Sequence, residues 1–150
     1  MFDVKRLKNI REDHDMSQAE VAKILKTSRS TYSLWELGIN AIPLSYLFEF
    51  AKYFNISIDY ILSNKRSSKF NYKKESTLNL KSLGLNIKEN RIKNNISQEN
   101  LAKLLGVTQP CIVRYEKGII EISIYNLYQI SSILNISIDE LLKDDNKVKI

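Results

Sequence analysis

The sequence holds few of the residues on which enzymes, metal sites and secreted folds depend. Among 150 residues there are one cysteine, Cys111, one histidine, His14, and four glycines. A lone cysteine cannot close a disulfide within the chain, and one cysteine with one histidine is too few for a metal site. Four scattered glycines form no glycine-rich phosphate loop. We therefore expect no enzyme activity, no cofactor and no bound metal.

The sequence also lacks long apolar runs. Residues 1–6 carry charge where a secretory signal needs an apolar core. No stretch is apolar over the roughly eighteen residues that a membrane span requires. These features predict a cytoplasmic protein with no membrane partner.

What the sequence does contain is an internal repeat. Residues 96–118 lie over residues 16–38 without a gap after a shift of eighty residues, and the NISID segment at 55–59 recurs at 135–139. Such self-similarity predicts two small domains. We expect domain 1 over residues 1–63, a linker over 64–84, domain 2 over 85–143 and a tail over 144–150.

Almost all of the net charge lies in the predicted linker. The formal net charge is +6, yet residues 1–63 hold eight Lys/Arg against eight Asp/Glu, and residues 85–150 hold nine against eight. Residues 64–84 hold six Lys/Arg and a single acid, Glu75. A basic strip suits a nucleic-acid backbone, and a linker kept soluble and extended by self-repulsion explains the charge equally well. Charge alone leaves both interpretations open.

The sequence pattern of each predicted domain indicates five short helices. In domain 1, apolar spacing and start signals predict helices over residues 4–14, from 17, over 28–38, from 43 and from 57. Ser17 and Glu20 form a capping box at the second helix, and Ser28 caps the third. We expect Tyr32 and Trp35 in the core. The fold class is therefore all-α.

Domain 2 repeats the pattern, with helices predicted over residues 85–94, 97–105, 108–115, 123–134 and 137–143. Gly106 ends its second helix where domain 1 has Lys26. If this turn needs a positive φ, Lys26 costs roughly 1 kcal/mol and domain 1 is the less stable domain. Asn90 stands where domain 1 has Ile10, on a face expected to be buried, and a hydrogen bond to a neighbouring carbonyl would satisfy it.

These segments together resemble the five-helix domain of the Xre-type helix-turn-helix family, which includes phage repressors and Cro. The resemblance covers nearly all of the chain outside the linker and tail. Its marks occur in the same order in both copies, as Ser17, Gln18, Ala22, Trp35, Glu36 and Gly38, then as Ser97, Gln98, Ala102, Tyr115, Glu116 and Gly118. The resemblance implies two tandem lambda-repressor-like DNA-binding domains joined by a basic linker and associated with the nucleoid.

The resemblance also implies which residues meet double-stranded DNA. The third helix of each domain would enter the major groove, where helix side chains reach base edges. The implied base contacts are Ser28, Arg29, Ser30, Ser33 and Leu34 in domain 1, and Thr108, Gln109, Pro110, Val113 and Arg114 in domain 2. Arg29 and Arg114 suit guanine, and Gln109 suits adenine.

Two further sets of residues follow from the resemblance. Contacts to phosphate, which set position without reading sequence, are implied for Ser17, Gln18, Ser97 and Gln98. Structural ion pairs are implied between Arg11 and Glu36 and between Arg91 and Glu116. All of these residues lie in the helices that would carry or support the DNA-reading surface.

The predicted function is a transcriptional regulator, a repressor, whose two unequal domains read adjacent half-sites. Leu34 stands where the family often has a polar residue, and Pro110 is tolerated because it falls in the first turn of its helix. Domain 2 is therefore expected to bind more tightly. The alternative is a protein-interaction or antitoxin-like module on the same fold, which the near-neutral domains keep open. Whether the chain forms a homodimer or holds a protein partner also stays open.

Overall fold

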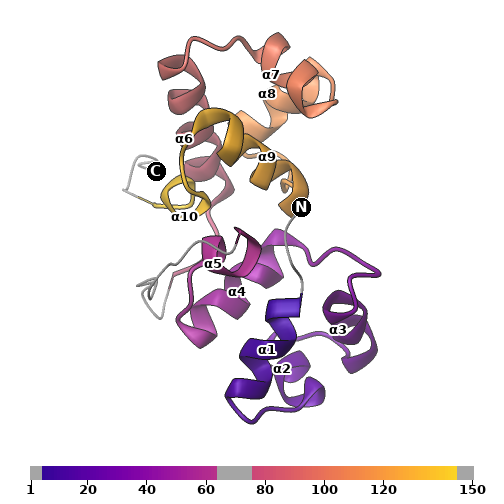
Figure 1. The fold of residues 1–150 in the computed structure, drawn as a ribbon. Coiled ribbons are helices and arrows are strands. Elements are labelled where there is room, and N and C mark those ends of the chain that lie inside the picture. The colour runs from indigo at the N-terminus through magenta and orange to yellow at the C-terminus, as the bar shows by residue number, and fades with distance from the viewer. Residues whose placement is uncertain (1–4, 64–75, 145–150) are drawn as a thin grey trace. The chain divides into compact units, whose positions relative to one another are not determined.

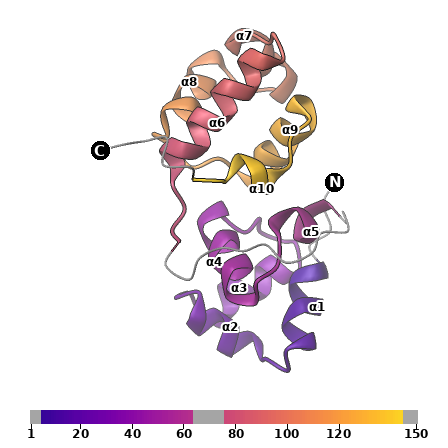
Figure 2. The same cartoon turned by 90° about the vertical axis from the view of Figure 1, so that its left-hand side faces the viewer.

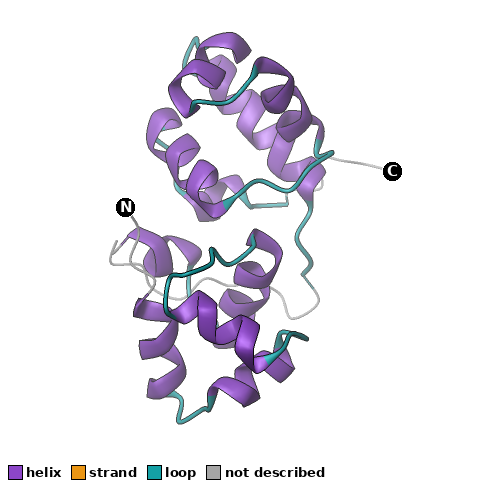
Figure 3. Cartoon of the chain, turned by 90° about the vertical axis from the view of Figure 1, so that its right-hand side faces the viewer, coloured by secondary structure: helices purple, strands orange, loops and turns teal. Residues whose placement is uncertain are grey.

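A computed structural model describes residues 5–63 and 76–144, and in these ranges the chain consists of helices joined by loops (Figure 3). The chain divides into two compact units, residues 1–77 and 78–150. Unit 1 contains α1 Lys5–Asp13, α2 Gln18–Ile24, α3 Arg29–Glu36, α4 Leu44–Phe54 and α5 Ile58–Ser63 (Figure 1). Unit 2 contains α6 Leu80–Lys93, α7 Gln98–Leu105, α8 Gln109–Lys117, α9 Ile124–Leu134 and α10 Ile138–Leu141. The prediction of an all-α fold with two five-helix repeats is confirmed.

Parts of three predicted segments fall outside the described residues. They are residues 1–4 at the start of domain 1, residues 64–75, which hold most of the basic linker, and residues 145–150, which form most of the tail. No helix in the described ranges is long and apolar enough to cross a membrane.

Side-chain caps start the two central helices of unit 1. Ser17 Oγ accepts a hydrogen bond from the Glu20 N–H at 3.1 Å, and Ser28 Oγ accepts one from the Thr31 N–H at 3.1 Å. α2 packs against α3. The core draws fully buried apolar side chains from all five helices, including Leu7, Val21, Tyr32, Leu47 and Ile58. Burial of each such side chain contributes roughly 1.5–3 kcal/mol, so packing sets the angle at which α3 is presented.

Unit 2 repeats this arrangement, with α6 lying along α8 and α7 packed against α8 (Figure 2). Its last four helices each begin with a hydroxyl that accepts the N–H three residues later, from Ser97, Thr108, Ser123 and Ser137. The core contains the counterparts of the unit 1 residues, namely Ile87, Leu101, Ile112, Leu127 and Ile138. Ser97 and Thr108 therefore cap α7 and α8 as Ser17 and Ser28 cap α2 and α3.

The first helix of unit 2 starts earlier than the sequence pattern indicates. α6 begins at Leu80 and not at residue 85, so residues 80–84 belong to this helix and not to the linker. Asn79 caps the helix, because its Oδ1 accepts the N–H groups of Lys81 and Ser82, each at 3.1 Å. Asp144 supports the cap by accepting hydrogen bonds from Asn79 Nδ2 at 3.1 Å and Ser82 Oγ at 3.0 Å. The helix that was predicted to start at Leu85 therefore starts five residues earlier.

Gly84 lets this added turn of α6 approach α8. A Cβ on Gly84 would collide with the backbone carbonyl oxygens of Glu116 and Tyr115, the latter at 2.5 Å. Backbone atoms cannot move aside as a flexible side chain can, so a larger residue would push the two helices apart. The absence of a side chain at residue 84 therefore allows the start of α6 to pack closely against the end of α8.

Two asparagines lie on the inner side of α6. The amide of Asn86 is 4% exposed and donates to the carbonyl oxygens of Leu141 at 2.8 Å and Lys143 at 2.9 Å. Asn90 is half-buried, and its Nδ2 donates to the Asn86 carbonyl oxygen at 2.7 Å. The predicted hydrogen bond from Asn90 to a neighbouring carbonyl is confirmed and lies within α6, whereas the two bonds of Asn86 connect α6 to the end of the unit.

The turn after the second helix is left-handed in both units. Lys26 has φ 59° in unit 1, and Gly106 has φ 70° at the matching position in unit 2. A side chain in this region crowds the following carbonyl, which costs roughly 1–2 kcal/mol, whereas glycine adopts it freely. The turn therefore has the positive φ on which the expected cost of Lys26 depends.

Candidate nucleic-acid interface

A buried ion pair connects α1, α2 and α3 in unit 1. Arg11 Nε donates to Glu36 Oε1 at 2.6 Å, Nη2 donates to Oε2 at 3.1 Å, and Nη1 donates to the Met16 carbonyl oxygen at 2.8 Å. Gln18 Nε2 adds a hydrogen bond to Glu36 Oε2 at 2.8 Å. The Arg11 and Glu36 side chains are 10% and 3% exposed. A bidentate arginine–carboxylate pair fixes the relative orientation of the two side chains. Because Gln18 bonds the same carboxylate, the start of α2 is held against the end of α3.

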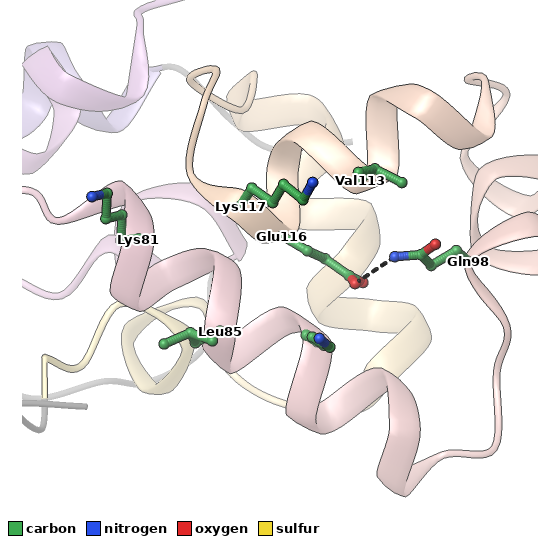
Figure 4. A pocket seen from close by; sticks show the side chains of 7 residues that line it. Lys81, Leu85, Gln98, Val113, Glu116 and Lys117 are labelled. Atoms are coloured by element: carbon green, nitrogen blue, oxygen red, sulfur yellow. Dashed lines mark hydrogen bonds between the residues drawn. The ribbon is translucent and has the colours of Figure 1, made fainter. Parts of the chain in front are cut away.

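Unit 2 builds the same network almost atom for atom. Arg91 Nε donates to Glu116 Oε2 at 2.6 Å and Nη2 donates to Oε1 at 3.1 Å, while Nη1 donates to the Ile96 carbonyl oxygen at 2.9 Å. Gln98 Nε2 donates to Glu116 Oε1 at 3.0 Å (Figure 4). Both implied ion pairs therefore form, and each brings a glutamine from the start of the second helix beside the third helix.

The Glu36 carboxylate is charged although it is buried. Burial raises the pKa of this carboxyl, but hydrogen bonds from Arg11 and Gln18 and the charge of Arg11 outweigh burial, so its pKa lies below the ordinary 4.5. The hydrogen bond to Glu36 raises the pKa of the Arg11 guanidinium in turn. Both groups are ionised at neutral pH, and the pair acts as a fixed part of the scaffold.

α3 has one apolar face in the core and one polar face outside it. Tyr32 and Trp35 are buried, as predicted. The residues implied as base contacts are on the other side: Ser28, Arg29 and Ser30 are exposed, and Ser33 and Leu34 are half-buried. Four of them, Arg29, Ser30, Ser33 and Leu34, line one shallow hollow. The structure thus brings the unit 1 residues together on a single surface.

α8 is arranged in the same way. Ile112 and Tyr115 are buried, and Cys111 is half-buried. The implied base contacts Thr108, Gln109, Pro110 and Arg114 are exposed, and Val113 is half-buried. Pro110 lies in the first turn of α8, where no helical hydrogen bond needs its missing N–H. The expected tolerance of this proline is confirmed.

The serines and glutamines implied as phosphate contacts lie at the starts of α2 and α7. Ser17 and Ser97 are exposed caps, and Gln18 and Gln98 are half-buried. Sequence reasoning missed that one hydrogen of each glutamine amide is used by the glutamate of the ion pair. The spacing of glutamine and glutamate is the same in both copies, and this repetition was the available signal.

A second feature that sequence reasoning missed is a groove in unit 2. Figure 4 shows it between α6, the start of α7 and α8, where it is lined by Lys81, Leu85, Lys88, Gln98, Val113, Glu116 and Lys117. Lys81, Leu85 and Lys88 follow i, i+4, i+7 spacing, which places them on one face of a helix. The pattern was hidden because residue 81 was assigned to the linker.

Comparisons with known proteins agree with this arrangement. The helix-turn-helix family model matches residues 7–61 and 87–141. The chain is 38% identical over 65 residues to the uncharacterised HTH-type transcriptional regulator YqaE of Bacillus subtilis (strain 168), an alignment covering 43% of this chain and 56% of that protein. The chain thus spans little more than half the length of this relative.

A solved structure is also similar. It is the restriction-modification controller protein C.AhdI from Aeromonas hydrophila, with 31% identity and a TM-score of 0.39, over 41% of this chain and 94% of that one. The family model, in contrast, matches both repeats and more than half of the sequence. The chain therefore belongs to the Xre/Cro-type helix-turn-helix family and carries the domain of that family twice.

Proposed function

We propose that this protein is a transcriptional regulator, a repressor, that binds a specific double-stranded DNA site with both of its units. The observation that carries the proposal is the presentation of α3 and α8. Each helix buries its apolar face, is held by a buried ion pair and exposes a row of polar side chains. A helix presented in this way fits the major groove of B-DNA.

The exposed side chains suggest how each unit would read bases. Arg29 in unit 1 and Arg114 in unit 2 are exposed and carry the planar guanidinium that bonds guanine O6 and N7 together. Gln109 can donate to and accept from adenine in the same manner. Each such contact discriminates by roughly 1–3 kcal/mol. Because the two helices differ at these positions, the preferred site would be asymmetric.

The starts of α2 and α7 would hold phosphates. The start of a helix is the positive end of its dipole and favours an anion, and each glutamine amide has a second hydrogen beyond the one that its glutamate accepts. The two units place an acid at different positions of this turn. Ser17 Oγ donates to Glu20 Oε1 at 3.1 Å in unit 1, where the matching residue of unit 2 is Asn100. Unit 2 has Glu99 in the first turn of α7, where the matching residue of unit 1 is Ala19.

The family relationship and the tandem repeat both support two DNA-binding units on one chain. Half-sites of helix-turn-helix proteins lie about 34 Å apart, one turn of DNA. A covalent connection between two DNA-binding units raises the effective concentration of the second unit at the DNA once the first is bound. A regulator bound in this way to a promoter represses it by occupying the DNA.

Competition between specific and scrambled DNA tests the proposal. Duplexes enriched from a random pool by the full chain are compared with scrambled duplexes of equal composition, over a range of salt concentrations. We expect at least a thousandfold preference, and an affinity that falls steeply as salt rises. Equal affinity for both duplexes, or capture of a stable protein partner without any DNA binding, would favour the protein-interaction alternative.

A further inference from the structure

The groove of unit 2 carries three lysines from two helices. Lys81 and Lys88 lie seven residues apart on α6, and Lys117 is the last residue of α8. All three are exposed, and none forms an ion pair with another residue in the described ranges. Figure 4 shows Lys81 and Lys117 on the two helices that flank the groove. The arrangement concentrates positive charge along one hollow.

The acid in the groove does not cancel this charge. Glu116 lines the groove, but its two oxygens accept hydrogen bonds from Arg91 and Gln98 and its side chain is 3% exposed. Arg91 already balances the carboxylate. The three lysines are therefore left to attract an anion from outside the unit.

The groove is continuous with the surface assigned to DNA. Val113, an implied base contact on α8, and Gln98, an implied phosphate contact on α7, line the same groove as the lysines. If α8 enters the major groove and Gln98 meets a phosphate, the DNA strand beside Gln98 passes next to the lysine-lined hollow. We propose that Lys81, Lys88 and Lys117 bind consecutive phosphates of that strand, and this inference rests on the proposed function.

Unit 1 has one lysine fewer at the matching positions, because Lys5 replaces Leu85 while Met1 and Leu37 replace Lys81 and Lys117. Lys117 matches Leu37, which is 67% exposed, so that position carries no charge in unit 1. Lys88 matches Lys8, which is 3.9 Å from the carboxylate of Glu12, whereas the residue four positions after Lys88 is Ile92. The lysine groove would thus make unit 2 the anchoring unit of the pair.

Charge-removing substitutions on α6 test this inference. The full chain with Lys81→Gln and Lys88→Gln is compared with a control carrying Lys103→Gln and Lys143→Gln. The control lysines are also on unit 2, are exposed, pair with Glu99 and Glu140, and lie outside the groove. Both variants lose the same charge, and circular dichroism checks that both are folded.

The readout is the slope of log affinity against log salt concentration on the enriched duplex. Two lost phosphate contacts lower the magnitude of the slope by about 1.8, so that between about 50 and 200 mM salt the wild type loses about tenfold more affinity than the α6 variant. Adding Lys117→Gln lowers the slope by about 0.9 more. The control slope changes less, and the selected DNA sequence stays the same because phosphate contacts do not read bases.

Two results would overturn the inference, and they are distinguishable. If the wild type prefers its duplex but the α6 variant and the control have the same slope, the lysine groove is wrong while the proposed function stands. If the wild type shows no preference among duplexes, the proposed function fails and the groove loses its ligand with it.

Discussion

The two units share a buried frame but differ at one left-handed turn and in surface charge. Arg11, Glu36 and Gln18 in unit 1 form the same hydrogen bonds as their three counterparts in unit 2. Outside this frame, Lys26 takes a left-handed conformation that Gly106 takes without strain, and exposed Leu37 replaces a lysine. The network that presents the outer helix is therefore common to both units, whereas the residue at the turn after the second helix and the exposed residues near the end of the third helix differ.

The largest expected effect comes from breaking the shared frame. Arg11→Ala leaves Glu36 buried without its cation, and Arg91→Ala does the same to Glu116, so each variant should lose about 3–5 kcal/mol of unfolding free energy in its own unit. Trp35, the single tryptophan, lies in the core of unit 1, so its fluorescence during urea unfolding reports that unit, while circular dichroism reports both. The exposed Lys23→Ala serves as the control, with a change within about 0.5 kcal/mol. A similarly small change in either arginine variant would show that the ion pair is not a structural frame.

A substitution at Gly84 should affect unit 2 alone. In an ordinary helix Gly→Ala stabilises by about 1 kcal/mol, but at this position the Cβ meets backbone carbonyls of α8. We expect Gly84→Ala to lower the unfolding free energy of unit 2 by about 1–3 kcal/mol, with the Trp35 transition unchanged. Lys88→Ala, on the exposed side of α6, is the matched control. A gain in stability with Gly84→Ala would contradict the close approach of α6 and α8.

Exchanging the turn residues should change the unfolding free energies of the two units in opposite directions. Lys26→Gly relieves the left-handed lysine and should raise the stability of unit 1 by about 1 kcal/mol, as read from the urea midpoint of Trp35 fluorescence. The reciprocal Gly106→Lys should lower the stability of unit 2 by about the same amount. If both substitutions lower the unfolding free energy of their own unit, the left-handed conformation of Lys26 is not strained.

The smallest effect is the pH dependence of the unit 1 ion pair, because burial and hydrogen bonding act on Glu36 in opposite directions. The folded pKa of Glu36 lies below its ordinary 4.5, so the pair contributes stability above that pH and the contribution is lost as pH falls through the folded pKa. The Trp35 urea midpoint should therefore fall more on acidification in the wild type than in Glu36→Gln. Equal acid sensitivity of the two proteins would assign the pH dependence to other carboxylates.

Most of the fold could be predicted because its signals are local. Ser17 and Ser28 cap the helices that they were expected to cap, Ser97 and Thr108 cap the matching helices of unit 2, and the repeat placed Gly106 and Lys26 at the same turn. The start of α6 was missed because Asn79 was not recognised as its cap, and the support that Asp144 gives this cap comes from a residue distant in sequence. The lysine groove was missed for the same reason, because it exists only when α6 includes Lys81. Exposure of the implied base contacts follows from helix geometry, but their pairing with bases depends on the shape of a duplex.

The central claim is that α3 and α8 each read their own part of one asymmetric DNA site. Selection of bound duplexes from random DNA, carried out with the wild type, Arg29→Ala and Arg114→Ala, tests it most directly. We predict that the wild type selects two unlike half-sites, and that each variant loses a guanine preference in one half while keeping the other half. Selection of a palindrome, or of the wild-type site by both variants, would contradict the account.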